Sequence, residues 1–285
     1  MDIRPSPIAG RWYPGKAEAL AASIDEYLEA AQADAPPGEI VGLVAPHAGH
    51  VYSGGVAAHA FRTVRRRTLE TVAILCPSHF HADGNLITSG HAAYATPLGV
   101  VEVDREAVAG LRAELAAALH EREAQTLVEI RRDQEHAIEI ELPFLQRALA
   151  ASFKLIPVMV RDQSKRIVQA LGLGLAKVLR EAGRPALVVA SSDLSHYQPQ
   201  DVALKLDDLM LQQIDAFDPA GVLTTEMEAE GKGFACGHGA IAATLWAARE
   251  LGANHAQVMK HATSGDVSGD YAQVVGYGAA VIWKE

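Results

Sequence analysis

Three short apolar segments of this chain each end in a polar loop that carries a histidine. Each segment has the length and composition of a buried β-strand. Ligands of open α/β sheets collect at the carboxyl ends of the strands, so neighbouring strands would bring these loops to one cleft. The three combinations of strand and loop are Ile40–Ala45 with His47, Ala73–Pro77 with His79 and His81, and Ala186–Ala190 with Asp193 and His196.

Segments of helical periodicity alternate with strands along most of the 285 residues. This alternation predicts an α/β fold with a mixed central sheet and helices on both faces. We find no linker or repeat, and we therefore expect one domain over residues 1–285. Further strands are expected at Leu86–Ser89, Leu98–Val103, Lys154–Val160, Gln257–Ala262 and Ala272–Trp283, with a loop at Ala92–Pro97. Helices are expected at Ala17–Ala33, Val56–Val64, Arg105–Leu119, His136–Leu149, Ser164–Ala182, Val202–Phe217, Pro219–Glu228 and Ala240–Leu251, with Ser164 as a possible cap.

The composition argues against nucleic acid and membrane partners. The formal net charge is −10, from 35 acidic and 25 basic residues, and no basic face is apparent. No apolar run approaches the roughly 20 residues of a membrane helix, and the N-terminal stretch does not resemble a signal peptide. The only cysteines, Cys76 and Cys236, do not form a disulfide framework. We therefore expect a soluble cytoplasmic protein.

The loop histidines and one cysteine have the chemistry of transition-metal ligands. Neutral imidazole binds divalent metals, and a few ligands from separate loops leave coordination positions open for catalysis. Cys236 lies among glycines, where a metal would stabilise its thiolate. Cys76 lies inside an apolar strand and is expected to serve packing. The other histidines in polar or glycine-rich surroundings are His50, His81 and His238, to which the sequence assigns no role.

Asp193 and His196 allow two interpretations. Asp193 can orient a ligand imidazole while His196 acts as acid or base. Alternatively, a serine from Ser191, Ser192 or Ser195 can act as the nucleophile of a hydrolase. We prefer the first interpretation, because the GxSxG pattern is absent and a triad within one loop is geometrically awkward.

Several other residues also have alternative roles. Trp12 can cap the core or line a pocket, and core capping is favoured from the residues alone. Glu135 and His136 can face the cleft or cap the following helix. Glu139 and Glu141 are two positions apart, so one of them is expected to face solvent.

Six motifs, in this order along nearly the whole chain, resemble the Memo family, whose prokaryotic members are called AmmeMemoRadiSam system protein B. They are Ala9-Gly10-Arg11-Trp12-Tyr13-Pro14, Ala45-Pro46-His47-Ala48-Gly49, Pro77-Ser78-His79, Glu135-His136-Ala137-Ile138-Glu139 with Leu142-Pro143, Ser191-Ser192-Asp193 with His196, and Ala235-Cys236-Gly237.

The resemblance implies a fold similar to that of class III extradiol (LigB-like) dioxygenases. It also implies a metal held by His47, His79 and Cys236, whereas those dioxygenases use two histidines and a carboxylate. Sulfur favours copper or zinc, and imidazole suits iron, copper and zinc, so we expect Fe(II) or copper, with zinc possible. The resemblance further places Trp12, Asp193 and His196 in the same cleft.

Three functions compete at this point. The first is a metal-dependent redox enzyme that acts on O2 or a small molecule, with Asp193 and His196 as catalytic residues and with Trp12 and His136 in the substrate or peptide pocket. The second is a non-enzymatic module that binds a peptide or protein, since relatives are linked with a radical-SAM protein and an AMMECR-type protein. The third is metal-assisted hydrolysis.

Overall fold

The main sheet places the carboxyl ends of its central strands at one edge. The computed structural model describes residues 2–32, 35–120, 123–228 and 233–285. Four parallel strands lie side by side at the centre, in the order β2 (Glu39–Ala45), β9 (Ala186–Ser191), β3 (Thr71–Pro77) and β8 (Lys154–Val160). They are buried along nearly their whole length, which explains their continuous apolar sequences. The segments that follow β2, β9 and β3 therefore meet at the same edge.

Antiparallel strands extend this sheet on both sides and make it mixed. On one side, β12 (Val274–Lys284) is antiparallel to β2, and it also pairs with β11 (His255–Thr263) and β10 (His196–Gln198). On the other side, β4 (Leu86–Ser89) is antiparallel to β8 and is followed by β7 (Val128–Ile130). A separate small sheet contains β1 (Ile3–Arg4), β5 (Ala93–Thr96) and β6 (Gly99–Glu102).

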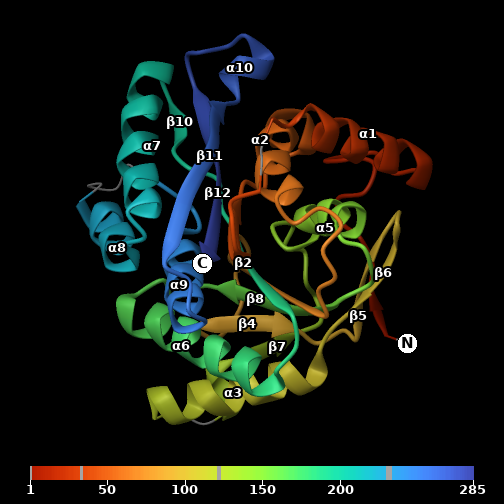
Figure 1. The fold of residues 1–285 in the computed structure, drawn as a ribbon, viewed down its shortest axis with the longest axis vertical. Coiled ribbons are helices and arrows are strands. Elements are labelled where there is room, and N and C mark those ends of the chain that lie inside the picture. Colours follow the sequence, from red (N-terminus) through yellow and green to blue (C-terminus); the bar gives the residue numbers. More distant parts are fainter. Residues whose placement is uncertain (1, 33–34, 121–122, 229–232) are drawn as a thin grey trace.

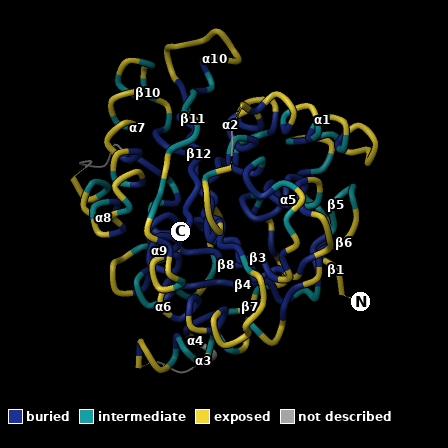
Figure 2. Tube along the Cα trace, in the orientation of Figure 1, coloured by how far each residue is buried: buried dark blue, intermediate teal, exposed yellow. Residues whose placement is uncertain are grey.

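Helices cover both faces of the main sheet, as Figure 1 shows. The strands and inner helix faces form one buried core, and exposed residues lie on the outer turns (Figure 2). The expected α/β class with a mixed sheet is thus confirmed. One group of helices is α1 (Ala17–Ala30), α2 (His50–Arg62) and α5 (Leu142–Ala148). The other is α3 (Arg105–Leu119), α6 (Lys165–Ala182), α7 (Gln200–Asp215), α8 (Pro219–Glu228) and α9 (His238–Glu250), and the short helices are α4 (Glu123–Thr126), η1 (Glu139–Glu141) and α10 (Gly265–Ser268).

The helix expected over residues 136–149 is wrong in its first part. Residues 133–138 form an irregular segment, and a 3-10 turn precedes α5. The Glu135 carboxylate accepts hydrogen bonds from the backbone N–H groups of His136 and Ala137. A side chain that binds neighbouring backbone groups in this way offers the chain an alternative to a helix.

Three smaller expectations also need correction. The stretch 92–97 contains strand β5 instead of a loop. Ser164 lies at the start of α6, but its side chain makes no capping hydrogen bond. The helix that begins at Ala17 ends at Ala30, and residues 33 and 34 lie outside the described residues.

No helix in the described ranges has both the length and the apolar character needed to cross a bilayer.

Candidate metal centre

His47 lies immediately beyond β2 and is almost completely buried, with 1% of its surface exposed. Its backbone N–H donates to Asp193 Oδ1 at 2.8 Å. Its ring atom Nδ1 lies 3.0 Å from the hydroxyl oxygen of Ser191, the last residue of β9. These contacts fix both the backbone and the ring of His47 and leave Nε2 on the opposite side of the imidazole.

Glu135 lies in the irregular segment before η1 and contacts two further histidines. Its Oε2 accepts the backbone N–H of His79 at 2.7 Å, and its Oε1 lies 2.9 Å from His79 Nδ1. The same Oε1 lies 3.2 Å from Nδ1 of His136. One buried carboxylate therefore hydrogen-bonds to Nδ1 of His79 and lies close to Nδ1 of His136. Carboxylates commonly lie behind metal-binding histidines in this way.

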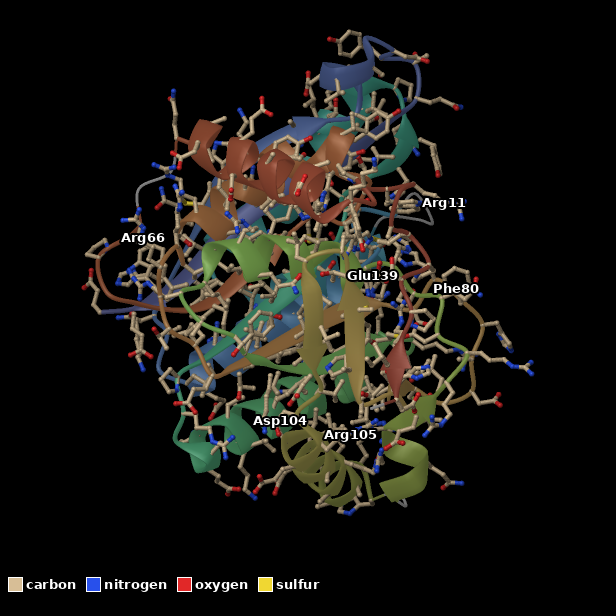
Figure 3. All side chains as sticks on the ribbon, turned by 90° about the vertical axis from the view of Figure 1, so that its right-hand side faces the viewer. Arg11, Arg66, Phe80, Asp104, Arg105 and Glu139 are labelled. Atoms are coloured by element: carbon tan, nitrogen blue, oxygen red, sulfur yellow. The ribbon has the colours of Figure 1, made fainter. Side chains whose placement is uncertain are left out.

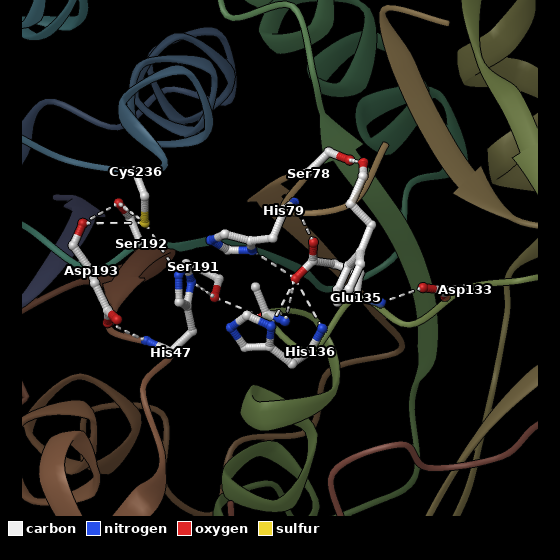
Figure 4. Close-up of polar contacts among 12 residues, drawn as sticks. His47, Ser78, His79, Asp133, Glu135, His136, Ser191, Ser192, Asp193 and Cys236 are labelled. Carbon is white, nitrogen blue, oxygen red and sulfur yellow. Dashed lines mark hydrogen bonds and ion pairs between the residues drawn. The ribbon is translucent and has the colours of Figure 1, made fainter. Parts of the chain in front are cut away.

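The three imidazoles converge on one point. Each of His47, His79 and His136 offers a ring nitrogen, and these nitrogens all lie within 4.8 Å of one another. The ring centroids of the three pairs are 5.1, 5.4 and 4.7 Å apart. Figure 4 shows the rings of His79 and His136 directed toward His47. The cluster confirms that the loops after β2 and β3 meet, and it adds a histidine from a third segment.

Burial keeps two of these imidazoles neutral. It lowers the pKa of His47 to about 3, and the neighbouring His79 acts in the same direction. Burial likewise lowers the pKa of His136 to about 3, assisted by His47. Burial also opposes the charge of His79, but the hydrogen bond and charge of Glu135 outweigh it and raise the pKa of His79. Burial opposes the charge of Glu135 too, but its contacts with His79 lower its pKa to about 2.

Cys236 lies beside His47, at the edge of the histidine cluster. Its Sγ is 3.2 Å from His47 Nε2, but it is not one of the three mutually close ligand residues. Burial raises the pKa of the Cys236 thiol. The backbone around it is fixed because Gly237 N–H donates to Ser192 Oγ and Gln163 Nε2 donates to the Cys236 carbonyl. A metal that reached this sulfur would have to stabilise the thiolate against that burial.

Asp193 holds the backbone of the first histidine loop and does not contact an imidazole by a hydrogen bond. Its Oδ1 accepts the N–H groups of His47 and Ala48. The contact with the His47 ring comes instead from Ser191, whose hydroxyl also reaches the Ala137 carbonyl at 2.7 Å. All three candidate serines are buried, and the hydroxyls of Ser191 and Ser192 form hydrogen bonds, so none of them is presented as an exposed nucleophile.

A cavity of about 490 Å³ opens above the cluster. His196, Trp12 and the three clustered histidines line it, and the Trp12 ring lies 4.2 Å from that of His136. Trp12 is therefore a pocket residue, and its neighbour Tyr13, 4% exposed, belongs to the core.

The remaining candidates lie elsewhere. His50 is buried and its Nε2 donates to the Ile140 carbonyl, so it joins α2 to η1. His81 lines a different cavity, and His238 Nδ1 lies near the Ala235 carbonyl. Cys76 is fully buried within β3, as expected.

The expectation that Glu139 or Glu141 faces solvent is wrong, because both are fully buried. Glu139 pairs with Arg4 and accepts a hydrogen bond from Tyr13, and Glu141 Oε1 lies 2.8 Å from Ser191 Oγ. Both carboxylates can be buried because each has a polar partner in the interior. Figure 3 shows Glu139 within the fold and Arg66 at its margin.

The sequence does not reveal that Glu135 and Ser191 contact the imidazoles of the cluster. Glu135 was expected to face the cleft or cap a helix, and Ser191 was considered only as a possible nucleophile. Their acceptor role depends on the fold, because Glu135 and His79 lie 56 positions apart. The adjacent pair of Glu135 and His136 is the one feature of the sequence that points to a carboxylate beside the histidines.

The fold and the cluster together define an α/β protein with a candidate metal centre at the carboxyl edge of its sheet. The family model described as Memo-like protein matches residues 4–281. A MEMO1 family protein of Methanopyrus kandleri is 37% identical over 99% of both chains. Another, from Methanococcoides burtonii, is 35% identical over 98% of this chain and 100% of that protein. The chain therefore belongs to the Memo family.

A solved structure shares the fold alone. It is that of an uncharacterised protein of Escherichia coli K12, with a TM-score of 0.54 and 11% sequence identity. The similarity covers 85% of this chain and 99% of the other.

Asp207 of α7 fixes the loop that carries His196 by a hydrogen bond to the preceding residue. Asp207 is fully buried, and its Oδ1 accepts the N–H of Ser195 at 2.9 Å. Its carboxylate lies directly against Gly276 of β12, where an added Cβ would come within 2.0 Å of Oδ2. Glycine at this position therefore permits the contact that holds the loop.

We expect Gly276→Ala to lower the free energy of unfolding by about 1–3 kcal/mol, because Asp207 must move and release Ser195. The matched control is Gly55→Ala within α2, where an added Cβ meets no atom within 4 Å. That control should be stabilising by roughly 0.5–1 kcal/mol, since alanine is the better helix former. Urea unfolding of both variants checks the prediction, and equal effects would contradict it.

Proposed function

We propose that this protein is a metal-dependent redox enzyme that acts on a small molecule. The observation that carries the proposal is the set of three imidazoles whose ring nitrogens lie within 4.8 Å of one another. Oxygen atoms of Glu135 and Ser191 contact the outward Nδ1 atoms, which leaves the inward nitrogens available as ligands.

The donor set fits iron or copper better than magnesium or calcium. Imidazole suits iron, copper and zinc, and thiolate favours the softer ions, whereas magnesium and calcium prefer oxygen ligands. In the proposed site, His47 and His79 are ligands whichever residue supplies the third position. Cys236, which the family resemblance implies, and His136, which completes the close cluster, are the two candidates for the third position. An iron or copper ion at this site would supply an electrophilic centre and one-electron chemistry.

The residues around the cluster have distinct proposed roles. His196 lines the same cavity without belonging to the cluster, and we assign it the transfer of a proton to or from the ligand. Asp193 keeps the His47 loop in place through its two backbone hydrogen bonds. Trp12 covers His136 and limits the access of water from that side.

Metal analysis of purified variants tests the proposal. The wild type should bind about one iron or copper ion per chain, and His47→Ala should weaken binding by a factor on the order of 100 or more, because a ligand loses more than the 10–100-fold cost of its supporting contact. Comparison of Cys236→Ser with His136→Ala identifies the third ligand. His59→Ala is the control, because its Nδ1 contacts the Gly55 carbonyl within α2 and His59 does not line the cavity.

Oxygen uptake by the metal-loaded protein then tests the redox step. A loaded protein that neither consumes oxygen nor oxidises a small-molecule panel would contradict the proposal. Zinc as the retained metal, together with hydrolysis of ester or amide probes, would support metal-assisted hydrolysis in its place.

A further inference from the structure

Tyr197 occupies a strained backbone position at a β-bulge. His196 pairs with Val275 and Gln198 with Val274, so β10 advances two residues while β12 advances one. Tyr197 is the extra residue, and its φ is +56°. Bulges of this kind usually have glycine in the left-handed position, because a side chain there is crowded by the backbone.

Burial of the Tyr197 side chain does not offset this strain. The side chain of Tyr197 is left 69% exposed, and its ring lies 5.7 Å from that of His196. The other described non-glycine residues with positive φ are Arg66, His120 and Phe217, and each lies at or shortly after the end of a helix. Left-handed residues are common at helix ends, but Tyr197 lies inside a strand.

The surrounding structure keeps the bulge in this conformation. Ser195 N–H donates to buried Asp207, and Gly276 N–H donates to the Ser195 carbonyl at 2.8 Å. The other oxygen of Asp207 lies 2.8 Å from His261 Nε2. Strained residues that are held so firmly from outside are concentrated at ligand sites, where a β-bulge redirects a side chain.

The bulge directs Tyr197 to the cavity above the histidine cluster. Tyr197 lines this cavity together with Trp12, Tyr52 and Val51, and the last two are 44% and 63% exposed. The floor is polar, whereas these lining residues are aromatic or aliphatic. Such a combination suits a ligand with a polar end and an apolar body.

We propose that Tyr197 is a ligand-contacting residue whose ring forms one wall of a subsite for the apolar or aromatic part of a small-molecule ligand. The polar end of that ligand reaches the histidine cluster. This inference rests on the proposed function, because the cluster must hold the metal that anchors the polar end.

Two hydroxamates that bind metals through the same group provide the test. Cobalt(II)-loaded protein is titrated with benzohydroxamate and acetohydroxamate, and the visible spectrum reports both cobalt binding and ligand binding. The wild type should prefer benzohydroxamate. Tyr197→Gly should reduce this preference by about 2- to 10-fold, the value of one aromatic contact, while acetohydroxamate binds as before. Tyr197→Phe should retain the preference.

Tyr271→Ala is the matched control, because this tyrosine is 50% exposed and does not line the cavity. It should leave the preference unchanged. In thermal unfolding, Tyr197→Gly should retain the wild-type Tm or exceed it by up to about 4 °C, because glycine relieves the left-handed strain.

Three outcomes would overturn the inference. A preference that persists in Tyr197→Gly would contradict the role of its ring and leave the metal site intact. A fall of several degrees in Tm would show that the ring serves folding. Failure to bind cobalt would contradict the proposed function and, with it, the ligand role of Tyr197.

Discussion

Replacing Arg4 by methionine is expected to lower the free energy of unfolding by about 3–5 kcal/mol, the usual cost of removing one partner from a buried ion pair. Arg4 is completely buried, and its guanidinium pairs with Asp133 at 2.6 Å and with Glu139 at 2.5 Å. It also donates to the Glu135 carbonyl and lies over the Tyr94 ring at 4.8 Å. Methionine would fill much of the space but leave two buried carboxylates without their cation.

The effect should extend to the proposed metal centre, because Arg4 fixes the segment that carries Glu135 and His136. Chemical denaturation measures the loss of stability, and metal titration measures the loss of affinity. Arg131→Met is the matched control, since Arg131 pairs with Asp2 on the surface and its side chain is 68% exposed. Exposed pairs contribute about 0–1 kcal/mol, so similar losses in the two variants would contradict the special role of Arg4.

A combined variant separates the charge effect from simple loss of packing. If unpaired carboxylates cause the loss, adding Asp133→Asn and Glu139→Gln to Arg4→Met should restore part of the stability. Further destabilisation on adding these changes would instead indicate that packing around the guanidinium dominates.

The meeting of the histidine loops could be predicted from the sequence because it depends on local patterns. Short apolar strands followed by polar loops predict parallel strands, and parallel strands deliver their carboxyl ends to one edge. The structure confirms this for His47 and His79, which follow β2 and β3 on either side of β9. The same patterns predicted the bounds of β4, β8 and α3 as the structure has them.

The conformation of the segment that carries His136 could not be predicted, because distant residues determine it. A helix was expected to begin at His136, but Arg4, 129 positions before Asp133, holds the segment 133–138 in an irregular conformation. The two-residue strand β1, which carries Arg4, is too short to give a periodic signal. Tertiary contacts outweigh local propensity in such segments.

Replacing Glu135 by glutamine is expected to weaken metal binding by about 10- to 100-fold, the usual cost of removing a carboxylate that orients ligand histidines. Glu135 is 2% exposed, and its carboxylate serves His79 and His136 at the same time. A glutamine retains one acceptor oxygen but replaces the other by an NH2 group. One of the two His79 nitrogens therefore loses its acceptor, and the substitution removes the negative charge that lies beside both imidazoles.

Calorimetric titration with zinc or iron(II) measures this effect, and Glu129→Gln provides the control in β7. Glu129 pairs with Arg112 at the surface at 2.6 Å and lies outside the cavity above the histidines. Its replacement should leave metal affinity unchanged. Unchanged affinity in Glu135→Gln would show that the histidines are held by the backbone alone. Glu135→Gln with a wild-type unfolding midpoint and weakened binding would instead assign the carboxylate to the metal centre, because a purely structural role would lower both together.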